Sequence, residues 1–258
     1  MRALVVLHDH VTEPGEVGVR LLERGYELST VTVVPESHRH APNLRFDFPA
    51  AQDWDLIVSL GAPWSVYDDA AIGNWIGGEL ALLRTAHHLG VPVLGVCFGA
   101  QALAAALGGS VETARRAEIG WIDVETDDPA LVPPGPWFVW HFDRCVIPPG
   151  AVELARSDVC TQAFMAGSSL GVQFHPEITT AAVEGWLGNG GAEQVARHGV
   201  DPDALLARSR AMQPYVRCST RRLVDGFLDG IPSRLPASQA HPARRFPATT
   251  PAEARNLV

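Results

Sequence analysis

The 258-residue chain contains no lysine, and all 20 of its basic residues are arginine. This absence excludes enzymes that depend on a lysine side chain, among them Schiff-base and pyridoxal-phosphate enzymes, GxxxxGK nucleoside triphosphatases and ordinary protein kinases. Basic charge is scarce as well, because 20 arginines face 29 acidic residues and leave a formal net charge of −9. Since no basic surplus exists to meet phosphates, we expect no nucleic-acid partner.

Cysteine pairs and long apolar runs are also missing. Four cysteines are present, but no two form a CxxC pair, which argues against zinc-ribbon and thioredoxin-like domains. No run of 18 apolar residues occurs, and the N-terminal apolar run is too short for a secretory signal. We therefore expect a cytoplasmic protein with reduced thiols and no membrane partner.

Apolar segments of strand length alternate with helical patterns through the first 107 residues. Strands are predicted at 3–7, 27–34, 56–60 and 93–96, and helices at 14–24, from Asp69 as cap to about 88, and at 99–107. Strands that are apolar on both faces are typical of a parallel sheet covered by helices on both sides. The predicted fold class is α/β, a three-layer sandwich around a central, mostly parallel sheet.

The pattern changes after residue 109. Short valine-rich segments as far as 173 predict antiparallel strands added to the sheet. Helical pattern returns from 179 and again at 203–228, where Pro214 is expected to interrupt the helix. We divide the chain into a main domain at 1–190, a helical extension packed on it at 191–231, and a proline-rich, mobile tail at 232–258.

The sharpest local pattern is GVCFGAQ at 95–101. An apolar strand ends just before Cys97 and a helix is predicted just after it, with glycines two residues away on either side. This is the pattern of a nucleophile elbow with cysteine in place of serine. The helix N-terminus offers N–H groups for an oxyanion and a positive potential that favours a thiolate. A lone cysteine is more often a buried structural residue, so this pattern alone decides little.

A second pattern, GVQFHPE at 171–177, follows another apolar strand. A cysteine nucleophile needs a base, and the base needs a partner that orients it. His175 and Glu177 provide both, and side chains two residues apart on an extended segment lie on the same side. The two patterns together favour a cysteine–histidine–glutamate active site.

GVCFGAQ and GVQFHPE resemble the two signature motifs of the class I (triad) glutamine amidotransferases. Three further segments agree with that family: SLGAPWSVYD at 59–68 resembles its oxyanion loop, EIGW at 118–121 its EIGW segment, and WHFD at 140–143 its WHGD segment. The match extends from Met1 to about Thr180. It is most similar to free-standing members akin to the glutaminase domain of GMP synthase, which implies a flavodoxin-like fold.

The resemblance implies a mechanism without cofactor or metal. Cys97 would attack the side-chain amide of glutamine, His175 would carry the proton, and Glu177 would orient His175. A glutamyl thioester would form and be hydrolysed, and the ammonia would pass to a separate synthetase. The resemblance also implies oxyanion-hole and substrate-binding residues, which are Gly61, Ala62 and Phe98 for the oxyanion, and Gln101, His141 and Phe142 for the substrate.

Three positions depart from the family's pattern, and one of them, Ala100, where relatives often carry histidine or methionine, is expected to be neutral. Ala62 stands where the oxyanion loop usually has a second glycine, and alanine donates its N–H there only with a negative φ. Phe142 replaces the glycine of WHGD beside the expected pocket, so a γ-glutamyl amide other than glutamine remains an alternative substrate.

Two other functions stay open. One is a stand-alone γ-glutamyl hydrolase or peptidase on the same fold, although such enzymes tend to carry a basic residue where this chain has Phe98. The other is a catalytically silent regulatory or binding subunit, against which the intact triad argues.

Overall fold

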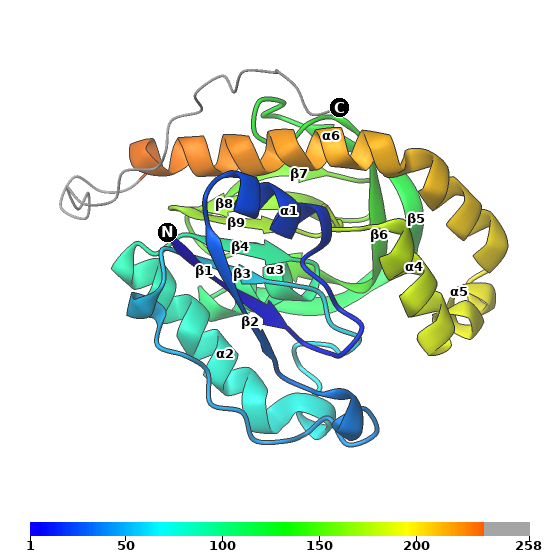
Figure 1. Cartoon of the computed structure of the whole chain (residues 1–258), viewed down its shortest axis with the longest axis horizontal. Coiled ribbons are helices and arrows are strands. Elements are labelled where there is room, and N and C mark those ends of the chain that lie inside the picture. Colours follow the sequence, from blue (N-terminus) through cyan, green and yellow to red (C-terminus); the bar gives the residue numbers. More distant parts are fainter. Residues whose placement is uncertain (235–258) are drawn as a thin grey trace, which may run out of the picture.

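The computed structural model describes residues 1–234. Within them, nine strands form one sheet in the order β2-β1-β3-β4-β9-β8-β7-β5-β6 (Figure 1). The strands are β1 (Arg2–Leu7), β2 (Glu27–Thr32), β3 (Leu56–Ser59), β4 (Val93–Val96), β5 (Ser110–Thr126), β6 (Gly135–Val146), β7 (Val152–Arg156), β8 (Thr161–Ala166) and β9 (Ser169–Val172). The five strands from β2 to β9 are parallel, and the other four are joined antiparallel.

Helices cover both faces of this sheet. They are α1 (Gly15–Glu23), α2 (Asp69–Leu89), α3 (Phe98–Ala106), α4 (Thr180–Trp186), α5 (Ala192–Arg197) and α6 (Pro202–Arg234). Alternate residues of β1 belong to two different cores: Val5 packs with α1 and α6, whereas Leu4 packs with α2 and α3. This alternation follows from side chains pointing to opposite faces of a strand. The predicted three-layer α/β fold is confirmed.

The predicted boundaries of the parallel core are accurate to one or two residues. Two other predictions, the cap of α2 and the length of the antiparallel strands, need correction. The side chain of Asp68, rather than that of Asp69, caps α2 by accepting from the backbone N–H of Ala71 at 3.1 Å. The antiparallel strands β5 and β6 are much longer than the short segments predicted, with 17 and 12 residues. β5 continues across a register shift between Thr113 and Glu118, where its sequence is largely polar.

The prediction that Pro214 interrupts the C-terminal helix is wrong. It is a single helix of 33 residues that passes through Pro214, and it changes direction on its way along the molecule (Figure 1). Proline removes one helical hydrogen bond and crowds the carbonyl four residues earlier, which bends a helix without always ending it. The helix extends to Arg234, past the boundary predicted between residues 231 and 232; the mobile tail at 232–258 stays a prediction, and 235–258 lie outside the described residues.

Two minor findings complete the fold. Short helical turns lie at Glu36–His38, Ala51–Asp53 and Leu187–Gly191. Among the helices of residues 1–234, none combines the length and the apolarity that crossing a bilayer requires.

Candidate active site

Cys97 lies where β4, an interior strand between β3 and β9, turns into a helix. It directly follows β4 and precedes α3, and its backbone has φ 51° and ψ −107°. It is the one residue other than glycine with positive φ in the described chain. A side chain in this region is strained, and such strain is concentrated at functional sites. The predicted elbow is therefore present as a backbone geometry as well as a sequence pattern.

The glycines beside the elbow are required by space. A Cβ placed on Gly95 would lie 2.6 Å from the carbonyl oxygen of Gly99. A Cβ on Gly99 would lie 2.0 Å from the carbonyl oxygen of Ser59 on the neighbouring strand β3. Larger side chains would separate the helix from the strands and move the sulfur, since real Cβ atoms do not approach so closely.

His175 and Glu177 follow β9, which is the parallel neighbour of β4. Because parallel strands end at the same edge of a sheet, the two motifs meet there, although 78 positions separate Cys97 from His175. His175 Nδ1 lies 2.7 Å from Glu177 Oε1, and both side chains are buried. A Cβ placed on Gly61 would lie 3.1 Å from His175 Cε1 and 3.9 Å from Cys97 Cβ, so the oxyanion loop passes beside both residues.

The electrostatics of His175 depend on its two partners. Burial alone would lower its pKa, but the charges of Glu177 and Cys97, and hydrogen bonds to both, raise the pKa of His175 to about 10. Its Nδ1 faces a carboxylate and therefore donates, which leaves Nε2 for the sulfur. The arrangement favours a protonated imidazole at His175.

The loop that carries Gly61 is anchored by His8 and Glu79, a pair that sequence analysis did not connect. His8 Nδ1 lies 3.1 Å from the carbonyl oxygen of Gly61, and His8 Nε2 lies 3.0 Å from both carboxylate oxygens of Glu79 on α2. Ser59 Oγ donates to Glu79 at 2.7 Å. Both ring nitrogens of His8 face carbonyl or carboxylate oxygens, which favours a ring that carries a proton on each nitrogen.

This pair is completely buried, with 0% of either side chain exposed. Burial lowers the pKa of His8, but Glu79 and the Gly61 carbonyl outweigh it, so the pKa of His8 is raised overall. A buried ion pair is a costly way to stabilise a fold, which suggests that its position matters more than its energy. Ala62, next along the loop, has no positive φ, so alanine can occupy the second glycine position.

Gln101, predicted to contact the substrate, lies at the base of the site. Its Nε2 donates to the carbonyl oxygen of Asp143 at 3.2 Å and to Gln173 Oε1 at 3.1 Å. Gln173 Nε2 in turn lies 3.5 Å from Cys97 Sγ. Gln173 is part of the second motif but had no predicted role, and it connects Gln101 to the sulfur.

A pocket of about 320 Å³ opens above these residues. Cys97 and His175 line it, together with all six residues predicted for the oxyanion and the substrate, which are Gly61, Ala62, Phe98, Gln101, His141 and Phe142. Another part of the pocket wall comes from a segment in which the sequence analysis found no functional motif, namely Trp186, Asn189, Gly190, Gly191, Gln194 and Arg197. Trp140 Nε1 donates to Gln194 Oε1 at 2.9 Å and ties this wall to β6.

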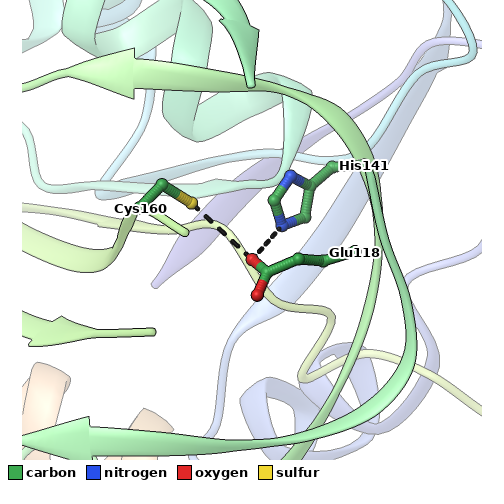
Figure 2. Close-up of side chains that lie close together, drawn as sticks. All are labelled: Glu118, His141 and Cys160. Atoms are coloured by element: carbon green, nitrogen blue, oxygen red, sulfur yellow. Dashed lines mark hydrogen bonds and ion pairs between the residues drawn. The ribbon is translucent and has the colours of Figure 1, made fainter. Parts of the chain in front are cut away.

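The two residues of WHFD that were predicted to bind the substrate, His141 and Phe142, make different contacts. Phe142 packs against the ring of His198, with ring centroids 5.0 Å apart. His141, on the same strand, uses its ring for contacts with other residues: Nδ1 lies 3.0 Å from the carbonyl oxygen of Asp143, and Nε2 lies 3.1 Å from Glu118 Oε2. Figure 2 shows His141 with Glu118 and Cys160, three side chains whose donor atoms could hold a metal ion.

The comparison with known families agrees with the two motifs. The sequence model of the family described as glutamine amidotransferase class-I matches residues 17–185. A GMP synthase (glutamine-hydrolyzing) of Thermomicrobium roseum is 34% identical over 190 residues, which cover 66% of this chain and 33% of that protein. The GMP synthase of a Synechocystis species is 38% identical over 131 residues, 47% of this chain and 23% of that protein. The chain thus spans about a third or less of these relatives.

Solved structures are similar over nearly the whole described chain. A glutamine amidotransferase from Methylobacillus flagellatus is 26% identical, with a TM-score of 0.75 and coverage of 89% of this chain and 94% of that one. A glutamine amidotransferase from Thermotoga maritima shares the fold at 23% identity, with a TM-score of 0.75 and coverage of 88% and 97%.

Proposed function

Because this chain belongs to the class I glutamine amidotransferases, a family of amide-hydrolysing enzymes, we propose that it hydrolyses glutamine, or a related γ-glutamyl amide, through a thioester on Cys97. The observation that carries the proposal is the strained elbow of Cys97 beside the buried His175–Glu177 pair. A glutaminase assay of the purified full-length chain tests it, with glutamate and ammonia measured separately.

In the first half of the reaction, the Cys97 thiolate attacks the amide carbon. The carbon–sulfur bond forms, the carbonyl becomes an oxyanion, and the carbon–nitrogen bond then breaks as His175 gives its proton to the departing ammonia. In the second half, neutral His175 takes a proton from water as the water attacks the thioester. Glutamate leaves, and the Cys97–His175 pair is restored.

The oxyanion would be held by the backbone N–H groups of Phe98 and Ala62. Phe98 opens α3, so its N–H has no partner within the helix. The N–H of Ala62 shares a peptide unit with the Gly61 carbonyl, and the two point in opposite directions because that peptide is trans. When His8 holds the carbonyl on one side, it directs the N–H to the other. His8 is therefore a positioning residue in this mechanism.

Replacing His8 with phenylalanine, in a Glu79→Gln background that leaves no unpaired buried charge, tests this role. The ring volume stays, but the anchor of Gly61 is lost. Since one oxyanion donor contributes on the order of 10² to 10³ in rate, we expect turnover of glutamine to fall roughly 10- to 100-fold. Alkylation of Cys97 by iodoacetamide forms no oxyanion and should keep its rate.

Ser59→Ala is the control, because it removes a bond to Glu79 and leaves the His8–Gly61 contact in place. Equal losses of turnover and alkylation in the His8 variant would contradict the positioning role.

A glutamine-like chloroketone or diazoketone should label Cys97 before any other thiol. Cys97 lines the pocket, whereas Cys145 and Cys160 are buried outside its lining and burial raises the pKa of Cys145 to about 12. Cys218 is exposed but has no histidine partner among the described residues. Because the chain has no lysine, trypsin places each cysteine on its own peptide, with Cys97 in 85–115. Mass mapping that finds another peptide labelled first would contradict the assignment.

The walls of the pocket support a second candidate, a stand-alone γ-glutamyl hydrolase. Phe142 and the 186–197 segment enclose the space beyond the reacting carbon, and Arg197 is the one arginine among the described side chains that line it. Arg197 could bind the α-carboxylate of either substrate. Faster turnover of a γ-glutamyl alkylamide than of glutamine would favour this second function.

If glutamine is the substrate, we propose that a separate synthetase receives the ammonia. The proposal is supported by the similarity of this chain to proteins named GMP synthase (glutamine-hydrolyzing). We propose that residues 191–231 form an extension that packs on the 1–190 domain and contributes Gly191, Gln194 and Arg197 to the pocket wall. Co-purification of the chain with a partner that raises its glutaminase activity would test the first of these proposals.

A further inference from the structure

A second cluster of reactive side chains lies behind the pocket wall. Glu118 and His141 are register partners on β5 and β6, and Cys160 lies on the turn before β8 (Figure 2). One ligand atom from each residue, an oxygen, a nitrogen and a sulfur, lies within 4.8 Å of the other two. All three side chains are buried. Neither of the two catalytic motifs includes any of them.

The hydrogen bonds of His141 leave a contact that needs a positive charge. Nδ1 lies 3.0 Å from the carbonyl oxygen of Asp143, which can only accept, so Nδ1 carries the proton. In a neutral ring Nε2 is then a bare acceptor, and it faces Glu118 Oε2 at 3.1 Å without a hydrogen bond. Two acceptors at this distance repel unless a proton or a metal ion lies between them.

The surroundings match the outer contacts of a metal site. A histidine that binds a metal usually donates its other N–H to a carbonyl or carboxylate, as His141 does. A carboxylate ligand is usually hydrogen-bonded in turn, and Glu118 Oε2 accepts from Ser157 Oγ at 3.1 Å and from Gln162 Nε2 at 2.8 Å. Within residues 1–231, no arginine forms an ion pair with Glu118, so no fixed cation balances its charge.

The geometry points to a binding site for a divalent cation of the zinc type, held by Glu118 Oε2, His141 Nε2 and Cys160 Sγ. Sulfur, imidazole nitrogen and carboxylate oxygen are the donors that Zn²⁺ combines, whereas Mg²⁺ and Ca²⁺ take oxygen alone. Cys160 Sγ lies 3.8 Å from the same Glu118 oxygen.

The proposed ion would stabilise the strand that carries the pocket wall. His141 lies between Trp140 and Phe142, both of which line the pocket, and it shares the Asp143 carbonyl with Gln101. The ion would thus clamp β5, β6 and the turn before β8 without touching the substrate. We expect it to be structural, with no step of the reaction passing through it.

Co²⁺ titration of the full-length protein tests the site, because a bound thiolate gives Co²⁺ an intense charge-transfer absorption. The titration uses a chelator-treated, reduced Cys97→Ser protein, since Cys97 and His175 could themselves bind the ion. We expect one equivalent of Co²⁺ with a thiolate band, displaced by Zn²⁺. The band should persist in Cys97→Ser/Cys145→Ala, which removes another buried thiol, and disappear in Cys97→Ser/Cys160→Ala.

When the Cys160→Ala variant folds, two results would overturn the site. One is a folded Cys97→Ser protein that gives no thiolate band, which would assign the His141–Glu118 contact to a shared proton. The other is a band that survives Cys160→Ala. If Cys160→Ala does not fold, Glu118→Gln in the same background decides instead, and its Co²⁺ affinity should fall at least about 10-fold. Unchanged affinity there would also overturn the proposal. None of these readouts depends on glutaminase activity.

Discussion

Replacing Cys97 with alanine is expected to abolish amide hydrolysis while the protein stays folded. The loss should be on the order of 10⁴-fold or more, because no other group in the pocket can form the thioester. Gln173, whose Nε2 lies 3.5 Å from the sulfur, is an amide and cannot act as a nucleophile. Cys218→Ala, on the exposed face of α6, is the matched control and should leave turnover unchanged.

The same position tests the strained backbone. Cys97→Gly should be as inactive as Cys97→Ala but more stable by about 1 to 2 kcal/mol, since glycine adopts the positive φ of 51° without a Cβ clash. Thermal unfolding of the two variants measures the difference. A glycine variant that unfolds at the lower temperature would contradict the strain, and near-normal turnover in either variant would contradict the mechanism.

The second large effect concerns His175 and Glu177. His175→Ala should lose nearly as much activity as Cys97→Ala, because His175 carries the proton in both halves of the reaction. Glu177→Gln keeps a hydrogen-bonding group of the same shape and should lose roughly 10- to 100-fold less. Single-turnover assays with glutamine measure both losses. Equal losses would mean that orientation of the ring, rather than proton transfer, limits the rate.

Glu177→Gln should also change the titration of the ring. The charge of Glu177 is one of the causes that raise the pKa of His175 to about 10, so its removal should lower that pKa. Histidine NMR resonances, assigned with the His175→Ala variant, report the change. An unaltered His175 titration would contradict the proposed electrostatic role of Glu177.

The sequence predicts the parallel core and the elbow well because each depends on local chemistry. Val93–Val96 is apolar throughout and lies between Pro92 and the elbow at Cys97, and β4 has those bounds. The long strand β5 was harder to predict, because Glu112, Arg115, Arg116 and Glu125 are exposed and a register shift interrupts its alternation. The continuity of α6 through Pro214 depends on packing: Leu223 and Phe227 bury the helix against the sheet.

The site shows the same division between local and long-range information. Cys97, His175 and Glu177 lie in two short motifs, whereas the partners of His8 and Glu118 come from distant positions. His8 directly follows β1, and a polar residue at the end of a parallel strand is a signal that could have identified it. No comparable signal marks Arg197, Gln194 or Cys160, whose positions depend on how α5 and the β7–β8 turn pack on the sheet.

One measurement tests the central claim most directly: acid quenching of the full-length protein during turnover of glutamine, followed by mass analysis of its tryptic peptides. The account predicts that peptide 85–115, which contains Cys97, carries one glutamyl group, and that the group disappears on treatment with hydroxylamine, which cleaves thioesters. Glu177→Gln should accumulate or retain the same adduct. Release of glutamate with that peptide never modified, or with the glutamyl group on another peptide, would contradict it.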